Sequence, residues 1–307
     1  MRLKRLLKRI NPIPHWTKFP DILSIDTTNI CNLKCAYCNF QDGWNLQRGY
    51  ITYEMFEDIM RQSARKIGQV RPFLHGDPMC DADRMPTFFS LIKDITNAEI
   101  VVYTNGSIYQ KRFFLSDEHI DRIHFTISAG TPETYLKVHG RPLFKEVVKT
   151  IEWVNENKYT HQRIIVQFVV RNLNAHEVPI WKDLFKGFEL VVSPLHLGYQ
   201  QDKSYTALKG TDWKDTIKQS TFLGKMSKKL PCYIWNTMCI TWDGTIILCC
   251  DAPLGFNYGK VGEISLATAW RRRIMEAMEN DACRNCRMKH PDWVSRLGVM
   301  KVKAKVR

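Results

Sequence analysis

The sequence predicts an α/β protein: a partial (β/α)6 barrel of the TIM type, followed by a small C-terminal β-hairpin and helix. Between residues 21 and 197, short β-rich apolar runs alternate with amphipathic segments, which is typical of a parallel sheet with right-handed crossovers. A chain of 307 residues has room for six such units, but not for eight plus the remaining segments. Further along, Asp243-Gly244 between two β-rich runs predicts a tight hairpin turn.

Each of the first five predicted strands is followed by a segment with a helical pattern. The expected strands cover residues 22–26, 70–74, 100–103, 123–128, 164–170 and 190–192. The expected helices cover residues 53–66, 83–95, 108–116, 145–157 and 178–185, and one more is expected over 265–278. Parallel β/α folds place their chemistry at the carboxyl ends of the strands, so we expect functional residues in the loops that follow strands.

The segments outside the barrel are polar or basic. We expect a basic N-terminal extension over 1–20, the barrel over 21–197, a linker over 198–230, a second small domain over 231–290 and a basic tail over 291–307. The apolar residues of the first ten fall on one helical face, which predicts a terminal helix docked on the domain or, as the alternative, a helix on a membrane surface. No run of about 18 apolar residues predicts a transmembrane helix, and the opening lacks the apolar segment of a signal peptide.

Composition indicates an ordinary globular protein with an excess of positive charge. Hydrophobic residues make up 44% of the chain and charged residues 25%. The net charge of +14 favours anionic partners, such as phosphorylated substrates, nucleic acid or acidic proteins. Ten cysteines without a secretion signal indicate metal binding in a reducing compartment rather than disulfides, so we expect a cytoplasmic protein.

Three cysteines, Cys31, Cys35 and Cys38, lie in the loop after the first predicted strand. This loop runs from residue 27 to about residue 50, and loops of such length are uncommon unless they are functional. Four thiolates complete a structural zinc site or a fully ligated cluster, whereas three leave one position of a [4Fe–4S] cluster open to a small molecule. The alternative is a zinc knuckle or a set of reduced thiols, but no His or fourth Cys follows at zinc-finger spacing.

The spacing C-x3-C-x2-C, with Tyr37 just before the last cysteine, resembles the signature of the radical S-adenosylmethionine (radical SAM) family. The resemblance implies that the open iron binds the amine and carboxylate of SAM, and that one electron from the cluster yields a 5′-deoxyadenosyl radical. It also implies an electron donor of the flavodoxin or ferredoxin type. Tyr37 is then expected to lie against the adenine through its backbone.

Three later loops resemble SAM-binding positions of the same family. The stretch after the second strand resembles a Gly-Gly-Glu-Pro motif whose backbone and carboxylate receive the ammonium group of SAM, although His75 replaces the first glycine and Asp77 is shorter than Glu. The loops after the third and fourth strands match positions that line the SAM pocket. The residues that this likeness assigns to SAM are Gly76, Asp77, Pro78, Thr104, Asn105 and Ser128.

The other polar residues near strand ends have more ordinary interpretations. Asn174 and Glu177 fit an Asn-x-x-Glu pattern found in relatives, but this spacing is also a helix N-terminal signature, which is the interpretation we favour. We expect His139, Arg141 and His196 to be structural residues, and Cys80 to be a buried thiol.

The second group of cysteines lies in the C-terminal third of the chain. A hairpin, a helix and the pair Cys283-x-x-Cys286 resemble the twitch/SPASM appendage of radical SAM enzymes. No further cysteines follow this pair, as a two-cluster SPASM domain would need, so the resemblance implies the one-cluster twitch form. The expected ligands of this auxiliary [4Fe–4S] cluster are Cys232, Cys249, Cys283 and Cys286; Cys239 or Cys250 in place of Cys232 or Cys249 is one alternative, and zinc in the same site is another.

This choice leaves Cys239 and Cys250 as candidate catalytic residues. Neighbouring residues on a strand point to opposite faces, so Cys249 and Cys250 would not serve one cluster. In radical SAM epimerases, a free thiol at the barrel mouth returns a hydrogen atom to the substrate radical. A small apolar core residue is the alternative role for either cysteine.

The resemblance therefore implies a SAM-dependent radical enzyme. Its expected reaction is dehydrogenation of an alcohol, with an electron passed to the auxiliary cluster, or epimerisation of a small polar or anionic, sugar-like substrate. The first alternative is a maturase that modifies a peptide or protein. The second is a non-enzymatic iron–sulfur or zinc protein that binds nucleic acid, a partner that we do not otherwise expect.

Overall fold

A computed structural model describes residues 18–38, 47–171, 173–194, 235–250 and 256–276 of the chain. Its first six strands are β1 (Ile22–Ile25), β2 (Gln69–Arg71), β3 (Glu99–Thr104), β4 (Arg122–Thr126), β5 (Arg163–Val170) and β6 (Glu189–Pro194). Each of them pairs in parallel with the next strand in sequence. The expected open barrel of six β/α units is confirmed.

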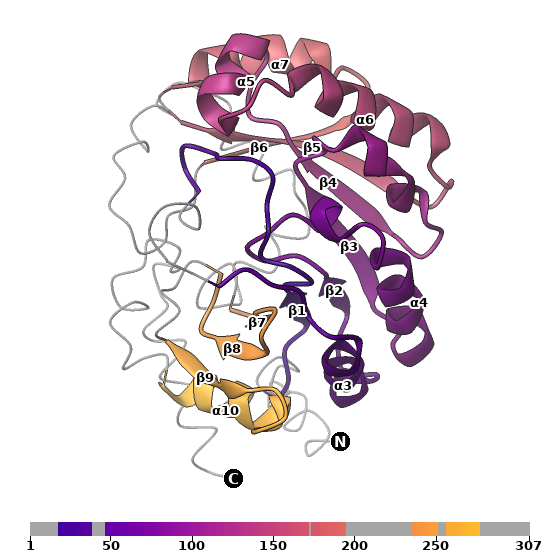
Figure 1. Cartoon of the computed structure of the whole chain (residues 1–307), viewed down its shortest axis with the longest axis vertical. Helices are drawn as coiled ribbons and strands as arrows, with labels where there is room; N and C mark the ends of the chain where they lie inside the picture. The colour runs from indigo at the N-terminus through magenta and orange to yellow at the C-terminus, as the bar shows by residue number, and fades with distance from the viewer. Residues whose placement is uncertain (1–17, 39–46, 172, 195–234, 251–255, 277–307) are drawn as a thin grey trace, which may run out of the picture.

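The helices pack on one face of this sheet (Figure 1). They are α3 (Tyr53–Ser63), α4 (Met85–Ile95), α5 (Pro132–His139), α6 (Phe144–Asn157) and α7 (Val178–Leu184), with short 3₁₀ turns η2 (Pro78–Asp81), η3 (Tyr109–Ser116) and η4 (Ala175–Glu177). Alternate strand residues, such as Ile123 and Phe125, are buried in the core between sheet and helices. The residues between them face the opposite, inner side of the sheet.

Two elements differ from the expectation. Residues 109–116 form a 3₁₀ helix rather than an α-helix, because the buried residues Phe114 and Leu115 are adjacent and give no apolar face at α-helical spacing. Helix α5 was not expected, although Thr131 caps its start, Pro132 is its first residue and Gly140 ends it in a left-handed conformation.

The C-terminal part continues the same sheet. Strands β7 (Thr237–Ile240) and β8 (Thr245–Ile247) form the expected hairpin around Asp243-Gly244, and an unexpected β9 (Asn257–Lys260) pairs with β8. Helix α10 (Leu266–Glu276) follows and lies near α3 (Figure 1). Because β7 pairs in parallel with β1, the strand order is β6-β5-β4-β3-β2-β1-β7-β8-β9. The hairpin therefore extends the barrel sheet directly.

The buried side chain of Arg273, on α10, connects this helix to the residues that flank the hairpin. Its guanidinium donates to the backbone oxygens of Leu248, at 2.8 Å, and Trp235, at 2.7 Å. It also lies 4.9 Å from the ring centroid of Trp235 and 4.6 Å from that of Trp270. A buried cation is thereby satisfied by carbonyl groups and aromatic faces.

No helix within the described residues is long and apolar enough to cross a membrane. The expected N-terminal extension, the linker over 198–230 and the basic tail fall almost entirely outside the described residues.

Candidate functional site

The loop that carries Cys31, Cys35 and Cys38 follows β1 and is docked on the end of α5. The backbone N–H groups of Lys34 and Ala36 donate to the carbonyl oxygens of His139, at 3.1 Å, and Val138, at 2.9 Å. The last carbonyls of a helix have no partner within the helix, so the loop satisfies them. All three thiols are half-buried, and none of them is in a disulfide. Two backbone hydrogen bonds to the end of α5 therefore position the part of the loop around Cys35.

Gly76 holds the loop after β2 against the cysteine loop. A Cβ atom on Gly76 would meet the carbonyl oxygen of Thr28 at 2.3 Å and that of Ile30 at 2.7 Å, so only glycine fits. The backbone N–H of Asp77 donates to the oxygen of Ile30 at 2.9 Å. In the described residues this close approach is to the chain's own backbone, where the family motif suggested an approach to SAM.

The carboxylate of Asp77 connects this loop to the end of β3. One oxygen accepts from the Thr104 hydroxyl and the Met79 N–H, both at 2.9 Å, and the other accepts from the Asn105 N–H at 2.7 Å. Desolvation raises the pKa of Asp77, and these hydrogen bonds oppose the rise. Pro78 begins η2 directly after this N-cap residue. The buried carboxylate of Asp77 thus joins two other predicted SAM-binding residues, Thr104 and Asn105, to its own loop.

Hydrogen-bond donors face two of the three thiols. The side-chain amide of Asn105 donates to the sulfur of Cys31 at 3.7 Å. The Nδ1 atom of His139 lies 3.3 Å from the sulfur of Cys35, and its Nε2 atom accepts from the backbone N–H of Ser128 at 3.1 Å. Tyr37 packs edge-on to His139, with ring centroids 6.1 Å apart. Predicted SAM-binding residues and cysteines therefore meet at the carboxyl ends of β1, β3 and β4.

Burial keeps the thiols of Cys31 and Cys35 protonated while no metal is bound. Desolvation, with the nearby Cys38 as the next cause, raises the pKa of Cys35 to about 12. Desolvation and then the Asp77 carboxylate raise the pKa of Cys31 as well. Metal ligation requires thiolates, so loading this site releases protons. Among the described residues, no three Cys, His, Asp or Glu side chains converge closely enough to enclose a single metal ion.

Two contacts that the sequence did not indicate support this site. Asp26, at the end of β1, accepts from the backbone N–H of His75 at 2.6 Å and lies 2.7 Å from its Nδ1 atom. Arg171, after β5, donates to the carbonyl oxygen of Ala36 at 3.1 Å and lies over the ring of Tyr37. The signal in the sequence that could have revealed these contacts was the position of Asp26 and Arg171 at strand ends.

A helical turn, η4, begins directly after Asn174 as the sequence predicts, but the expected capping role of the Asn174 side chain is wrong. Its side chain makes no capping hydrogen bond; instead its amide donates to the carbonyl oxygens of Ser128 and Val169. Glu177 accepts from the N–H of Gly130, at 2.7 Å, and from the Thr131 hydroxyl, at 2.5 Å, so it serves the start of α5. Tertiary contacts at the end of β4 override the local signature.

The inner face of the sheet carries a polar and aromatic stack that the sequence analysis did not identify. His124 lies on Tyr103 with ring centroids 4.3 Å apart, Tyr103 stacks on Phe73 at 5.7 Å, and the Arg71 guanidinium is 5.6 Å from the Tyr103 centroid. Only 9% of His124 is exposed, and neither ring nitrogen has a hydrogen-bond partner within the described residues. Desolvation, followed by the cations Arg122, Arg71 and Arg163, lowers the pKa of His124 to about 3. The alternation of strand residues was the signal that could have revealed this stack.

Two described cysteines of the second set, Cys239 and Cys250, lie next to the inner face. Cys249 and Cys250 follow the end of β8 and pack on different sides, Cys249 against the main core and Cys250 against the inner cluster, as expected for neighbours that do not serve one cluster. Cys239, on β7, is 1% exposed and clusters with Leu74 and Ile247, and Cys250 packs against this cluster. Leu74 directly precedes the His75-Gly76 loop. The two candidate hydrogen donors are therefore close to one another.

Several predicted residues lie elsewhere. Cys232, Cys283, Cys286 and His196 are outside the described residues, so the ligand set of the auxiliary cluster stays a prediction. Arg141 is exposed, and Cys80 is half-buried. Desolvation, followed by Asp77, raises the pKa of Cys80 to about 11.

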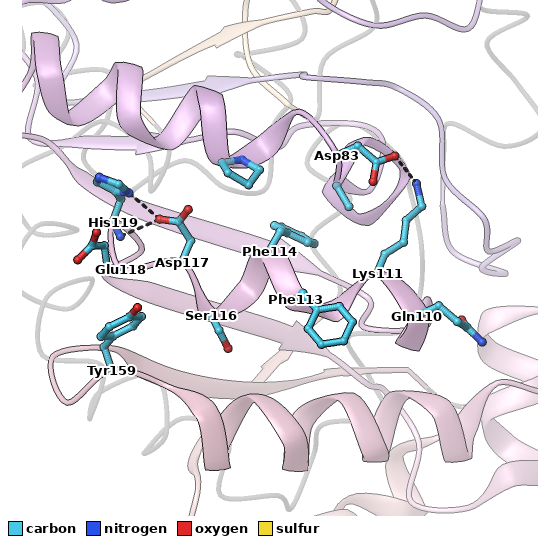
Figure 2. A pocket seen from close by; sticks show the side chains of 12 residues that line it. Asp83, Gln110, Lys111, Phe113, Phe114, Ser116, Asp117, Glu118, His119 and Tyr159 are labelled. Atoms are coloured by element: carbon cyan, nitrogen blue, oxygen red, sulfur yellow. Dashed lines mark hydrogen bonds and ion pairs between the residues drawn. The ribbon is translucent and has the colours of Figure 1, made fainter.

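A separate groove of about 540 Å³ runs beside η3 (Figure 2). None of the predicted site residues lines it. Lys111 pairs with Asp83 at 3.1 Å and His119 with Asp117 at 2.6 Å, so these charged groups of the groove satisfy each other.

Comparison with known proteins agrees with the position of the site. The family model described as the radical SAM superfamily matches residues 25–183, and the SPASM model, an iron–sulfur cluster-binding domain, matches residues 232–287. A protein of Methanococcus maripaludis named "Probable GTP 3′,8-cyclase" is 27% identical over 161 residues, 52% of this chain and 53% of that protein. The chain thus spans about half the length of this curated relative.

Two solved structures share the fold over most of the chain. Streptococcus suis SuiB bound to the precursor peptide SuiA has a TM-score of 0.64 at 16% identity, covering 92% of this chain and 74% of SuiB. The structure of anSMEcpe with bound AdoMet has a TM-score of 0.62 at 15% identity, covering 94% of this chain and 98% of that chain. At these identities the likeness concerns the fold alone.

Proposed function

The chain belongs to the radical SAM superfamily, and we propose that it abstracts a hydrogen atom from a C–H bond of a small polar or anionic substrate. Its SPASM-type domain and its radical SAM domain imply two [4Fe–4S] clusters and SAM as cofactors. We assign the SAM-binding cluster to Cys31, Cys35 and Cys38. We assign the auxiliary cluster to Cys232, Cys249, Cys283 and Cys286.

The observation that carries the proposal is the presentation of three cysteines, none of them in a disulfide, from one loop, with two of the sulfur atoms facing N–H donors. A thiolate ligand is stabilised by such donors, so the residues fit an iron–sulfur cluster. When bound, the cluster and SAM supply the 5′-deoxyadenosyl radical that removes the hydrogen atom. The chain's part is to hold the ligands, to frame SAM with Gly76, Asp77, Thr104 and Asn105, and to exclude water.

The inner face of the sheet supports a polar or anionic substrate. The Arg71 guanidinium carries a positive charge beside the stacked rings of Tyr103 and His124. Burial lowers the pKa of His124 to about 3, so its enclosed ring is neutral at physiological pH and adds no charge to this face. A substrate with an acidic group would pair with the Arg71 guanidinium.

The reaction then ends in one of two ways. In dehydrogenation, the substrate radical loses a proton and an electron, which the auxiliary cluster would accept, and the product is lighter by two hydrogens. In epimerisation, a thiol gives the radical a hydrogen atom on the opposite face, and the resulting thiyl radical must be reduced by one electron and one proton. Cys250 is the better donor, because it is half-buried whereas Cys239 is enclosed.

The test is anaerobic preparation of the full chain, with iron analysis and SAM cleavage under dithionite. We expect about eight irons per chain, as two cubane clusters require, and release of 5′-deoxyadenosine. Cys35→Ser should remove about four irons and abolish cleavage. Cys80→Ser is the matched control, because Cys80 lies near the same loop without an assigned ligand role, and it should retain both properties. Equal loss in the two variants would contradict the ligand assignment.

A deuterium experiment separates the two reactions. Solvent deuterium in the product at carbon indicates a thiol donor, and a product lighter by two hydrogens indicates oxidation. If Cys250 is the donor, Cys250→Ala should stop epimerisation while SAM cleavage continues. Loss of the auxiliary iron in that variant would instead make Cys250 a ligand.

Other substrates follow from the relatives. SuiB, which shares the fold, binds a precursor peptide, so peptide or protein modification is a second candidate. The name of the curated relative makes GTP a third candidate substrate. GTP is an anionic nucleotide that could pair with Arg71 and contact the aromatic stack on the inner face. Stimulation of 5′-deoxyadenosine release by GTP or by a peptide library, each measured against SAM alone, distinguishes these substrates. A nucleic-acid-binding iron–sulfur protein would instead show no SAM cleavage and a steep salt dependence of binding.

A further inference from the structure

His139 lies between two parts of the site that are far apart in sequence. It is the last residue of α5 and is 1% exposed. On one side its Nε2 atom is 3.1 Å from the backbone nitrogen of Ser128. On the other side its Nδ1 atom is 3.3 Å from the sulfur of Cys35. The ring therefore bridges the end of β4 and the cysteine loop.

The contact with Ser128 fixes the tautomer of the ring. A backbone N–H can only donate, so the Nε2 atom that receives it must be the unprotonated nitrogen. In a neutral imidazole the proton then resides on Nδ1. That N–H points to the sulfur of Cys35, so His139 is a donor to this ligand.

Packing and backbone contacts fix the orientation of the ring. The Tyr135 ring lies against it with centroids 4.4 Å apart, and the Tyr37 ring meets it edge-on at 6.1 Å. The carbonyl oxygen of His139 itself accepts from Lys34, within the cysteine loop. The donor and the loop that carries its acceptor are thus held by the same residue.

We propose that His139 is a positioning residue that raises the reduction potential of the N-terminal cluster through an Nδ1–H hydrogen bond to the Cys35 thiolate. The reduced cluster carries one more negative charge than the oxidised cluster, so a donor to a ligand sulfur stabilises the reduced form more strongly. The inference rests on the proposed function of the cysteine loop. It concerns this chain's own histidine, which is supplied by a helix 104 positions further along.

Two substitutions separate the two contacts of the ring. In His139→Asn, the side-chain amide can occupy the Nδ1 position and keep a donor for Cys35 while the acceptor for Ser128 is lost. In His139→Gln, the longer side chain can place its oxygen at the Nε2 position and keep the acceptor while the Nδ1 donor is lost. If His139 had only a structural role, the reduction potential of the cluster would not be more negative in His139→Gln than in His139→Asn.

The measurement is an EPR-monitored redox titration of the full, cluster-loaded chain, with iron analysis to verify loading. The N-terminal cluster is recognised by the change that SAM causes in its signal, and a Cys31→Ala/Cys35→Ala/Cys38→Ala chain supplies the auxiliary signal for subtraction. For His139→Gln we expect a more negative potential, with the reduced-to-oxidised ratio at a fixed potential lowered about tenfold, equivalent to about 59 mV for one electron. For His139→Asn we expect a potential close to that of the unaltered chain.

Pulsed EPR in deuterated buffer gives an independent readout. The exchangeable proton of the N–H···S contact should be detected in the unaltered chain and in His139→Asn, and be absent in His139→Gln. An unchanged potential in His139→Gln, with full iron content, would overturn the inference. A failure of the proposed function would look different, because the unaltered chain would then show no signal that responds to SAM.

Discussion

Asp77 shows how one side chain can have a role that its motif does not describe. The family motif assigns its carboxylate to the ammonium group of SAM, whereas here both oxygens accept hydrogen bonds from the chain itself. The residue is buried, and its partners lie on η2 and at the end of β3. Its first effect is to hold together the loops that we propose bind SAM.

We therefore expect Asp77→Asn to destabilise the fold as well as weaken SAM binding. The new amide group would face an N–H or hydroxyl donor, and an unsatisfied buried group costs about 1–3 kcal/mol. Thermal unfolding and SAM titration measure the two effects. Asp83→Asn is the control, because the same change there affects an exposed carboxylate that pairs with Lys111. A lower SAM affinity with unchanged stability would mean that the carboxylate serves the ligand instead.

At this scale the sequence revealed local patterns and missed distant partners. The three cysteines lie within eight positions, so their spacing alone indicated a cluster. The pairs Asp26–His75 and Cys35–His139 are separated by 49 and 104 positions. Such contacts depend on which strand ends meet in the sheet, so no spacing rule could predict them.

At the scale of elements, the end of α5 is the support of the cysteine loop. Gly140 ends the helix with a φ of +75°, and a Cβ atom there would meet the carbonyl oxygen of Lys34 at 2.5 Å. The tight approach lets Lys34 and Ala36 reach the last carbonyls of the helix. Helix α5 has only eight residues, too few to show a clear apolar period in the sequence.

Gly140→Ala should therefore weaken retention of the iron–sulfur cluster by more than the backbone strain of the substitution accounts for. The left-handed conformation costs a non-glycine residue about 1–2 kcal/mol, and the clash with Lys34 would also displace the cysteine loop. Gly187→Ala is the matched control, because Gly187 has a φ of +100° but no atom within 4 Å of the added Cβ. We expect similar falls in unfolding temperature from strain alone, but faster loss of iron to a chelator only in Gly140→Ala. Equal rates of iron loss in the two variants would show that the close approach of Gly140 to Lys34 does not support the cysteine loop.

The whole molecule is organised by one continuous sheet. The sequence indicated a barrel and a separate C-terminal domain, because it shows runs of strand residues but not which strands pair. In the structure β1 is an inner strand, with β2 on one side and β7 on the other. All four residues of β1 are buried, and the cysteine loop begins a few residues after its end. The C-terminal part thus supplies one of the two neighbours of β1, the strand that precedes the cysteine loop.

This arrangement predicts that the barrel is not stable without β7. A chain that ends after residue 230 would expose the backbone groups of β1, including the N–H of Asp26 that donates to Ile240 at 2.9 Å. An unpaired edge of this kind favours aggregation. We expect this chain to elute as aggregate in size-exclusion chromatography, whereas a chain that ends after residue 290 keeps β7 and should elute as the full chain does. If the shorter chain were instead monodisperse, with about four irons and SAM cleavage, residues 21–197 would be an independent domain and the pairing of β1 with β7 would be dispensable.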